Sequence, residues 1–437
     1  MLVMKFGGTS VQDASALRQV ASIIHNHAAE PGGVVVVLSA TSGTTNTLLS
    51  LAERAGRGEV ISDELTMLEV RHSGILSELA PQASHTDLNE LLHECRSYAR
   101  ALQILGECTP QSLDHMTAFG ERLSTTILSS ALRANTPSSV YFDVRTVMRT
   151  NDEFCAAQVD MHHTRSLCSQ HLAPLCASGS IVITQGFLGS TSDGRTTTLG
   201  RGGSDYSAAI LGAALSAREI QIWTDVSGVY SADPRYVPEA QPITELSFGE
   251  VRELALYGAK VLHPDTIAPA VEALIPVCVL NTFRPEDAGT RIVAHTPSTA
   301  AIHAVSIVRG CSLVQCSVAT AAHIRSVPEL GRSIILESET VESAMLVLKI
   351  SGDDGILALE VAITDTEVVI QPTSLLAVSG PHVNMPIILA EIAASISAFT
   401  IRAITTGAAT HTIFVAVDEL QSNEALRAIH AIIPRHR

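Results

Sequence analysis

The sequence has no CxxC pair of cysteines and no uninterrupted run of ~20 apolar residues, the length that a membrane span needs. Its eight cysteines are scattered through apolar stretches, which is typical of free thiols in a reducing compartment and argues against a zinc site. The chain runs from Met1 into a glycine-rich motif by Gly7, which leaves no room for a secretory signal. We therefore expect a soluble, cytoplasmic protein with no membrane partner and no metal ion held by the protein alone.

Basic residues are also few, because 28 Lys and Arg stand against 44 Asp and Glu, for a formal net charge of −16. Such a surface repels nucleic acid, which we exclude as a partner. Only three of the basic residues are lysines, and two of them, Lys5 and Lys260, lie beside glycine-rich or turn motifs. A lysine at such a place supplies a compact point charge for phosphate. Chance is the alternative interpretation, and we accept it for Lys349.

Short β-like runs alternate with helical patterns along the first two thirds of the chain, beginning with 2–6, 14–27 and 34–39. The continuous apolar run at 34–38 is typical of a strand that is buried on both faces. We therefore predict an α/β fold with a mainly parallel central sheet between helices. After 295–299, where turn residues gather, the order becomes strand, helix, strand, strand. Such a small unit hides its sheet by pairing with another copy.

The sequence contains neither a Walker A motif nor GxGxxG, but two other glycine-rich segments follow predicted strands. Segment 5–10 follows the first strand, and segment 199–205 precedes a helix that we predict from about Tyr206 to Ala217. Their backbone N–H groups can approach phosphate closely, and the second segment adds a helix N-terminus. A third segment, 223–235, leaves a strand at its carboxyl end, where open sheets bind ligands. A plain surface loop is an equally good interpretation of that third segment.

Several segments together resemble the aspartate kinase branch of the amino-acid kinase family, and most closely its lysine-sensitive type. They occur in the family's order and span Leu2 to about His295. They are Lys5–Ser10, Leu38–Asn46, Phe119–Arg122, Phe142–Arg145, Thr184–Phe187, Arg195–Asp205, Trp223–Arg235 and Tyr257–Pro264. The resemblance implies transfer of the γ-phosphoryl group of ATP to the side-chain carboxylate of L-aspartate. The product, 4-phospho-L-aspartate, would enter the biosynthesis of lysine and diaminopimelate, threonine and methionine.

The resemblance also implies a role for individual residues. The catalytic residues would be Lys5, Asp205 and Lys260. The substrate-binding residues would be Ser39, Thr45, Glu121, Arg201, Ser204 and Asp205. The cofactor-binding residues would be Lys5, Gly7, Gly8, Thr224, Asp225, Tyr230, Arg235 and Lys260, with Mg²⁺ bound together with ATP. Structural roles remain as alternatives: Glu121 and Arg122 could form a helical ion pair, Thr45 could cap a helix, and Tyr230 could be a core aromatic residue.

For the domains, the resemblance implies a catalytic domain at 1–296, with a helical insertion at about 44–132, and a regulatory region at 304–437. That region would hold two ACT-like βαββαβ domains, one inserted at about 318–369 and the other formed by 304–317 plus 370–437. It would make a homodimer or a higher homo-oligomer and could bind an amino-acid effector. The segment 321–330 departs from the pattern, because it lacks the usual glycine and carries Pro328. We therefore expect weak or no inhibition by lysine.

Two other functions remain open at this point. One is a kinase of another small amino acid, such as glutamate, since one methylene in a pocket is worth only ~1–3 kcal/mol. The other is a non-catalytic amino-acid sensor with the same fold. The presence of all five favoured residues argues against the sensor: Lys5, Glu121, Arg201, Asp205 and Lys260.

Overall fold

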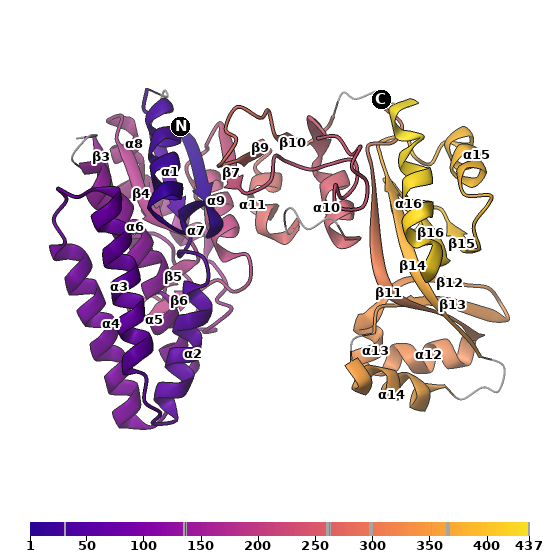
Figure 1. The fold of residues 1–437 in the computed structure, drawn as a ribbon, viewed down its shortest axis with the longest axis horizontal. Coiled ribbons are helices and arrows are strands. Elements are labelled where there is room, and N and C mark those ends of the chain that lie inside the picture. The colour runs from indigo at the N-terminus through magenta and orange to yellow at the C-terminus, as the bar shows by residue number, and fades with distance from the viewer. Residues whose placement is uncertain are drawn as a thin grey trace. The chain divides into compact units, whose positions relative to one another are not determined.

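The computed structural model describes residues 1–29, 32–133, 136, 138–258, 262, 264–296, 300–350, 352–363 and 368–435. The chain forms two compact units. The first consists of Met1–Gly228 with His263–Ala294, and the second of Val229–Leu262 with His295–Arg437 (Figure 1). The stretch 229–262 thus belongs to the second compact unit, although the sequence analysis places it in the catalytic domain. The predicted domain boundaries stay predictions.

The sheet of the first unit has the strand order β3-β4-β2-β1-β7-β9-β10. Neighbouring strands run parallel throughout, except that β10 is antiparallel to β9. The mainly parallel sheet predicted from the sequence is therefore confirmed. The strands are β1 (Leu2–Phe6), β2 (Val34–Leu38), β3 (Ser139–Phe142), β4 (Ile181–Gln185), β7 (Glu219–Thr224), β9 (Val277–Asn281) and β10 (Thr290–Val293).

Helices cover both faces of this sheet. On one face, apolar side chains of β1 and β2 join a core with the helices of residues 14–132. Successive side chains of a strand point to opposite faces, so Val3 and Lys5 point to the other face, where α9 packs on β1, β2 and β7. The helices are α1 (Ala14–Asn26), α2 (Thr44–Gly56), α3 (Ser62–Leu79), α4 (Thr86–Leu105), α5 (Pro110–Thr117), α6 (Phe119–Arg133), α7 (Met161–Leu167), α8 (Ala173–Ala177), α9 (Gly203–Ala214) and α11 (Ala268–Glu272).

The predicted helix from about Tyr206 to Ala217 is α9, but both predicted ends were wrong. The helix begins at Gly203 because Gly202 adopts a left-handed conformation, with φ 73°, and acts as the N-cap. It ends at Ala214, and the non-glycine residue Ser216 then adopts φ 51°, which breaks the helical path. The earlier start places Ser204 and Asp205 in the first helical turn.

The second unit contains an antiparallel sheet with the order β12-β13-β11-β14-β16-β15. The two long central strands, β11 and β14, pair along nearly their whole length, with one irregularity between Val308 and Cys311. They therefore belong to both halves of the sheet. The strands are β11 (Ala304–Ser317), β12 (Ile334–Glu339), β13 (Ser343–Leu348), β14 (Val369–Ser379), β15 (Ile401–Thr405) and β16 (Thr412–Asp418).

Each half of this sheet has helices of its own, as Figure 1 shows. One half packs against α15 (Pro386–Ser395) and α16 (Ser422–His430), and the other against α12 (Val318–Ser326), α13 (Pro328–Ser333) and α14 (Gly352–Ala362). The element order is βαββαβ with shared central strands, which confirms the predicted ACT-like region. Pro328 opens α13 and separates it from α12, as a residue without a backbone N–H does at the start of a helix.

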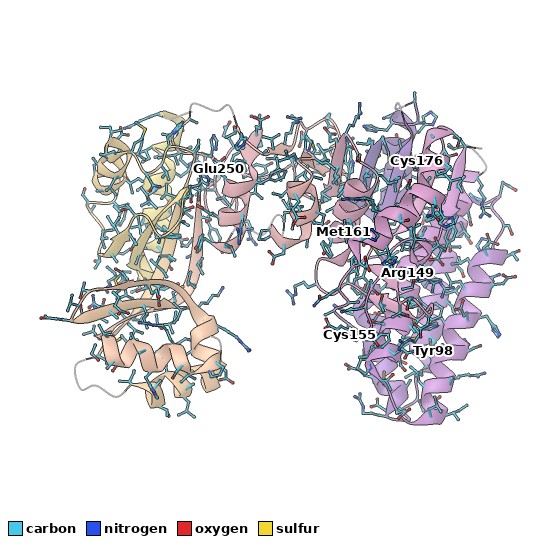
Figure 2. All side chains as sticks on the ribbon, turned by 180° about the vertical axis from the view of Figure 1, so that it is seen from behind. Tyr98, Arg149, Cys155, Met161, Cys176 and Glu250 are labelled. Atoms are coloured by element: carbon cyan, nitrogen blue, oxygen red, sulfur yellow. The ribbon has the colours of Figure 1, made fainter. Side chains whose placement is uncertain are left out.

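The same unit also contains β8 (Glu245–Ser247) and α10 (Phe248–Leu256). Ser247 caps α10, and Glu250 completes a capping box. Glu250 is fully buried, and one of its oxygens lies 2.6 Å from His303 Nδ1 (Glu250 is labelled in Figure 2). Within the described ranges, no helix is both long enough and apolar enough to cross a membrane.

Candidate active site

The register of the parallel strands brings the glycine-rich motifs to one edge of the sheet. Phe6 lies opposite both Leu38 of β2 and Trp223 of β7, and Leu38 lies opposite Gln185 of β4. The chain segments that follow these four strands therefore leave the sheet side by side. In open α/β sheets, ligands bind at this carboxyl edge.

A cleft with a volume of about 820 Å³ lies at this edge, within the range of small-molecule sites. It brings together most of the residues that the sequence analysis assigned to substrate and nucleotide. These are Lys5, Gly7, Gly8, Ser39, Thr45, Glu121, Arg201, Ser204, Asp205 and Thr224. Residues without a predicted role also line the cleft, among them Thr41, Leu113, Asp114, Thr117, Cys155, Phe187 and Thr198.

Lys5 and Asp205 form an ion pair inside the cleft. Lys5 Nζ lies 2.7 Å from Asp205 Oδ1, and the two side chains are only 10% and 20% exposed. The alternation of β1 turns Lys5 toward α9, and the early start of that helix places Asp205 above it. A Cβ atom on Gly7 would lie 3.5 Å from Lys5 Nζ, so glycine at this position keeps the space beside the ammonium group open.

The first turn of α9 presents backbone N–H groups to the same volume. The N–H groups of Ser204 and Asp205 have no intrahelical acceptor, since the first residues of a helix lack one. The N-terminus of a helix also carries a partial positive charge. Glycine at position 203 allows the start of α9 to lie close to Phe187, because a Cβ atom on this residue would lie 2.6 Å from Phe187 Cδ2. This part of the cleft is therefore suited to an anion.

Glu121 supplies a buried carboxylate at the start of α6. The helix approaches the segment after β2 closely, since a Cβ atom on Gly120 would lie 2.8 Å from Ala40 Cβ. Glu121 is 3% exposed, and its Oε1 accepts a hydrogen bond of 3.1 Å from the Ala40 N–H. Its Oε2 has no hydrogen-bond partner among the residues that the structure describes. Burial raises the pKa of Glu121 to about 8. The unpaired oxygen is positioned to receive a ligand with hydrogen-bond donors.

Two of the structural alternatives for these residues are wrong. Arg122 does not pair with Glu121 but forms two hydrogen bonds, of 3.0 and 2.8 Å, with Glu94. Thr45 does not cap α2, because the N-cap of that helix is Gly43. Both Glu121 and Thr45 thus remain available to a ligand. Arg201 is exposed at the cleft, and no other side chain in the described ranges pairs with it.

The predicted nucleotide residues divide between the two units. Thr224 lines the cleft, and its hydroxyl donates to Asp225 Oδ1 at 3.2 Å. Tyr230 is half-buried in the second unit, and Arg235 of that unit pairs with Asp233 at 2.6 Å. Their role at the nucleotide stays a prediction. Lys260 lies outside the described residues.

Asn281 is a residue of this region that the sequence analysis missed. Its amide donates to Ser227 Oγ at 2.9 Å, and its Oδ1 accepts from the Phe283 N–H at 2.8 Å. It therefore ties the turn after β7 to the turn after β9. An isolated asparagine at a strand end gives no motif from which this could have been predicted.

Residues 1–281 match the model of the amino acid kinase family. The chain belongs to this family. It is 41% identical over 315 residues to lysine-sensitive aspartokinase 3 of Escherichia coli (strain K12), which covers 72% of this chain and 69% of that relative. An aspartokinase of Chlamydia muridarum is 36% identical over 293 residues, and the chain covers 63% of its length. Aspartate kinase activity follows from these relationships, which confirms the resemblance found in the sequence.

Solved aspartokinase structures are similar over the whole chain. E. coli aspartokinase III in complex with aspartate and ADP has a TM-score of 0.77 and 33% identity, with 99% of both chains covered. The same enzyme in complex with lysine and aspartate has a TM-score of 0.82 and 32% identity. The aspartate kinase of Clostridium acetobutylicum has a TM-score of 0.86 and 25% identity, with 99% of this chain covered. The similarity to these aspartokinases thus covers both units of the chain.

The raised pKa of Glu121 predicts a pH dependence of stability. Between its ordinary value of 4.5 and about 8, the native state keeps the proton and the unfolded state does not. Stability therefore falls as pH rises through this window and levels off above it. In Glu121→Gln, which resembles the protonated form, this fall should be absent. Urea unfolding without substrates, from pH 5 to 9, measures the difference.

Glu250→Gln is a suitable control for this experiment. Burial alone would raise the pKa of Glu250, but hydrogen bonds from His303 and Ser247 hold it below its ordinary value. Its contribution to stability is lost only as the pH falls below this window. Parallel pH profiles for the unmodified protein and Glu121→Gln would contradict the assignment of Glu121.

Proposed function

We propose that the cleft transfers the γ-phosphoryl group of ATP to the side-chain carboxylate of L-aspartate, forming 4-phospho-L-aspartate. One observation carries this proposal: Lys5, Glu121, Arg201 and Asp205, from three segments that are distant in the sequence, line a single cavity. It contains a partly buried cation for phosphate, an exposed cation and an unpaired carboxylate oxygen. These are the charges that a nucleotide and an amino acid require.

Aspartate is held at its α-carboxylate and its ammonium group. The guanidinium of Arg201 binds the α-carboxylate through two parallel hydrogen bonds. Glu121 Oε2 receives the ammonium group, whose charge favours the ionised carboxylate, so binding releases a proton from Glu121 at neutral pH. The hydroxyl groups of Ser39, Thr45 and Ser204 donate further hydrogen bonds. The side-chain carboxylate is left to face the phosphate.

ATP lies with its phosphates at Lys5 and the first turn of α9. Gly7 and Gly8 allow the backbone to come close to the phosphates. The rest of the nucleotide and its phosphates are bound by Thr224, Asp225, Tyr230, Arg235 and Lys260. No group of three or more His, Cys, Asp or Glu side chains within the described ranges could hold a metal ion. Mg²⁺ usually binds through one or two carboxylates together with substrate phosphates and water, and the carboxylate of Asp205 would hold it here. Mg²⁺ supplies charge neutralisation at the phosphates.

The transfer needs no general base. The aspartate side chain, with a pKa of ~3.9, is already ionised at neutral pH. Lys5 and the N–H groups of α9 stabilise the charge on the transferred group. Because Asp205 pairs with Lys5, the ammonium group is already oriented before the substrates bind. The chemical step then depends on holding the two anions together.

The second unit has a regulatory function in this proposal. Its ACT-like sheet joins two or more copies of the chain and can respond to an amino-acid effector. The enzyme works in the cytoplasm, at the first step of the pathway to lysine, diaminopimelate, threonine and methionine. This placement rests on the relatives, whose activity is the same.

Trapping of the acyl phosphate with hydroxylamine tests the proposed activity. With Mg-ATP we expect hydroxamate from L-aspartate and little from L-glutamate, whose extra methylene misplaces the acceptor. A colour reaction with iron(III) measures both. Equal product from glutamate would identify a kinase of another amino acid. No product from either would favour the non-catalytic sensor.

Lys5→Ala should reduce turnover by at least about a hundredfold, because the charge at the transferred phosphate is lost. Lys349→Ala is the matched control, since this lysine is exposed in the second unit and should keep the full rate. Steady-state kinetics with circular dichroism to verify folding measure both variants. A near-normal rate in folded Lys5→Ala would refute the assignment of Lys5.

Added L-lysine should inhibit this enzyme weakly or not at all. In E. coli aspartokinase III a lysine complex is known, but here Pro328 divides the helical region of the inserted ACT-like half into α12 and α13. Helix α12 thus ends at Ser326, and segment 321–330 lacks the glycine that the family pattern has there. A lysine titration of the hydroxamate assay measures this, and inhibition at micromolar lysine would show that the altered half still binds it.

A further inference from the structure

Asp114 of α5 is a cleft-lining carboxylate to which the proposed function gives no role. It is 1% exposed, yet it accepts hydrogen bonds from three donor groups. The Cys155 N–H lies 3.0 Å from each carboxylate oxygen, the Thr198 N–H lies 3.0 Å from Oδ2, and the Thr198 hydroxyl lies 2.6 Å from Oδ1. No cation in the described ranges pairs with it. Burial raises the pKa of Asp114, and these hydrogen bonds oppose the rise.

The donors belong to two segments that the carboxylate joins. Thr198 ends β6 (Thr196–Thr198), which pairs with β5 (Leu188–Ser190), and Cys155 lies in the loop 151–157. A further hydrogen bond of 2.9 Å, from the Ala157 N–H to the Thr198 carbonyl, links the same two segments. Asp114 therefore holds α5, this loop and the end of β6 together.

Cys155 (labelled in Figure 2) is the strained point of this arrangement. Its φ of 70° lies in the left-handed region, which a residue with a side chain keeps only where its surroundings hold it. The bonds from its N–H to Asp114 do so. Its carbonyl oxygen faces Gly200, where a Cβ atom would lie 3.4 Å from it. The loop that Asp114 fixes thus packs against the residue that precedes Arg201.

We propose that Asp114 is a positioning residue that fixes the turn 199–202 and thereby directs Arg201 toward aspartate. The inference rests on the proposed role of Arg201 at the α-carboxylate. Asp114 acts on the turn through two residues. Thr198, which donates to Asp114, directly precedes the turn, and Cys155, which also donates to Asp114, packs against Gly200 within the turn. The phosphate-binding residues Lys5 and Gly7 belong to β1 and its turn, to which Asp114 makes no hydrogen bond. The turn 199–202 leads into α9, but the first turn of α9 is also held by the Lys5–Asp205 ion pair. Loss of Asp114 should therefore raise the KM for aspartate more than the KM for ATP.

Asp114→Asn is the sharpest variant, because it keeps the shape and replaces one of the two acceptor oxygens with a donor group. An amide group has one oxygen acceptor, and its NH₂ would face donors from Cys155 or Thr198. We expect the KM for aspartate to rise about tenfold, as for a buried donor left unpaired, with the KM for ATP changing less than about twofold. In an Arg201→Ala background the same change should have little further effect, because residues that act through one another are not additive.

Two further variants complete the test. Thr198→Val removes only the hydrogen bond from the Thr198 hydroxyl to Asp114 and should raise the KM for aspartate by a smaller factor. This variant tests the proposal if Asp114→Asn does not fold. Glu250→Gln, in the second unit, also removes a buried carboxylate that accepts several hydrogen bonds. It should lower the melting temperature but leave the KM for aspartate unchanged.

The outcomes separate the two hypotheses. A raised KM for aspartate in Arg201→Ala, together with a normal one in Asp114→Asn, overturns only the positioning role of Asp114. An unchanged KM in Arg201→Ala overturns the proposed function of Arg201 as well. Equal increases in both KM values, or additive effects in the double variant, identify Asp114 as a purely structural residue.

Discussion

The ion pair between Lys5 and Asp205 is the interaction on which the cleft depends. It connects the end of β1 to the first turn of α9, so it fixes the helix N-terminus above the carboxyl edge of the sheet. Both charges are mostly withdrawn from water, and the loss of one would leave the other unpaired at a cost of up to about 3–5 kcal/mol. In the proposed function, the pair therefore holds the Lys5 ammonium group in place where the phosphates bind. The glycine-rich turns after β1 and before α9 leave space beside this ammonium group.

The net charge of −16 gives this local arrangement its importance. ATP and aspartate are both anions, and the protein as a whole repels them. At physiological ionic strength, however, interactions are screened beyond ~8 Å, so groups in direct contact decide the binding. In the proposed function, these groups are Lys5, Arg201 and the first-turn N–H groups of α9. A chain with few basic residues can thus bind two anions because its cations are concentrated where the anions meet.

The sequence was sufficient for features that local pattern determines. The apolar run at 34–38 is fully buried as β2, and the strand 2–6 was predicted at its observed bounds. The start of α9 was missed because it depends on the left-handed conformation of Gly202, which composition does not reveal. Asp114, Cys155 and Asn281 were missed for another reason. Their roles arise from hydrogen bonds between segments that are distant in the sequence, and they carry no spacing signal of their own.

In the proposed function, the substrate preference of the cleft follows from the buried carboxyl group of Glu121. Within the described part of the chain, Glu121 Oε2 is buried without a hydrogen-bond partner, and this burial disfavours ionisation of the carboxyl group until a positively charged donor binds. An amino acid brings that donor, whereas a plain dicarboxylate does not and would leave Glu121 protonated or unpaired. Sites built to hydrogen-bond a substrate group reject analogues that lack it far more strongly than sites that measure one methylene. In the proposed function, Glu121 therefore selects the amino group of aspartate, whereas the length of the aspartate side chain is selected by the distance between Arg201 and Lys5.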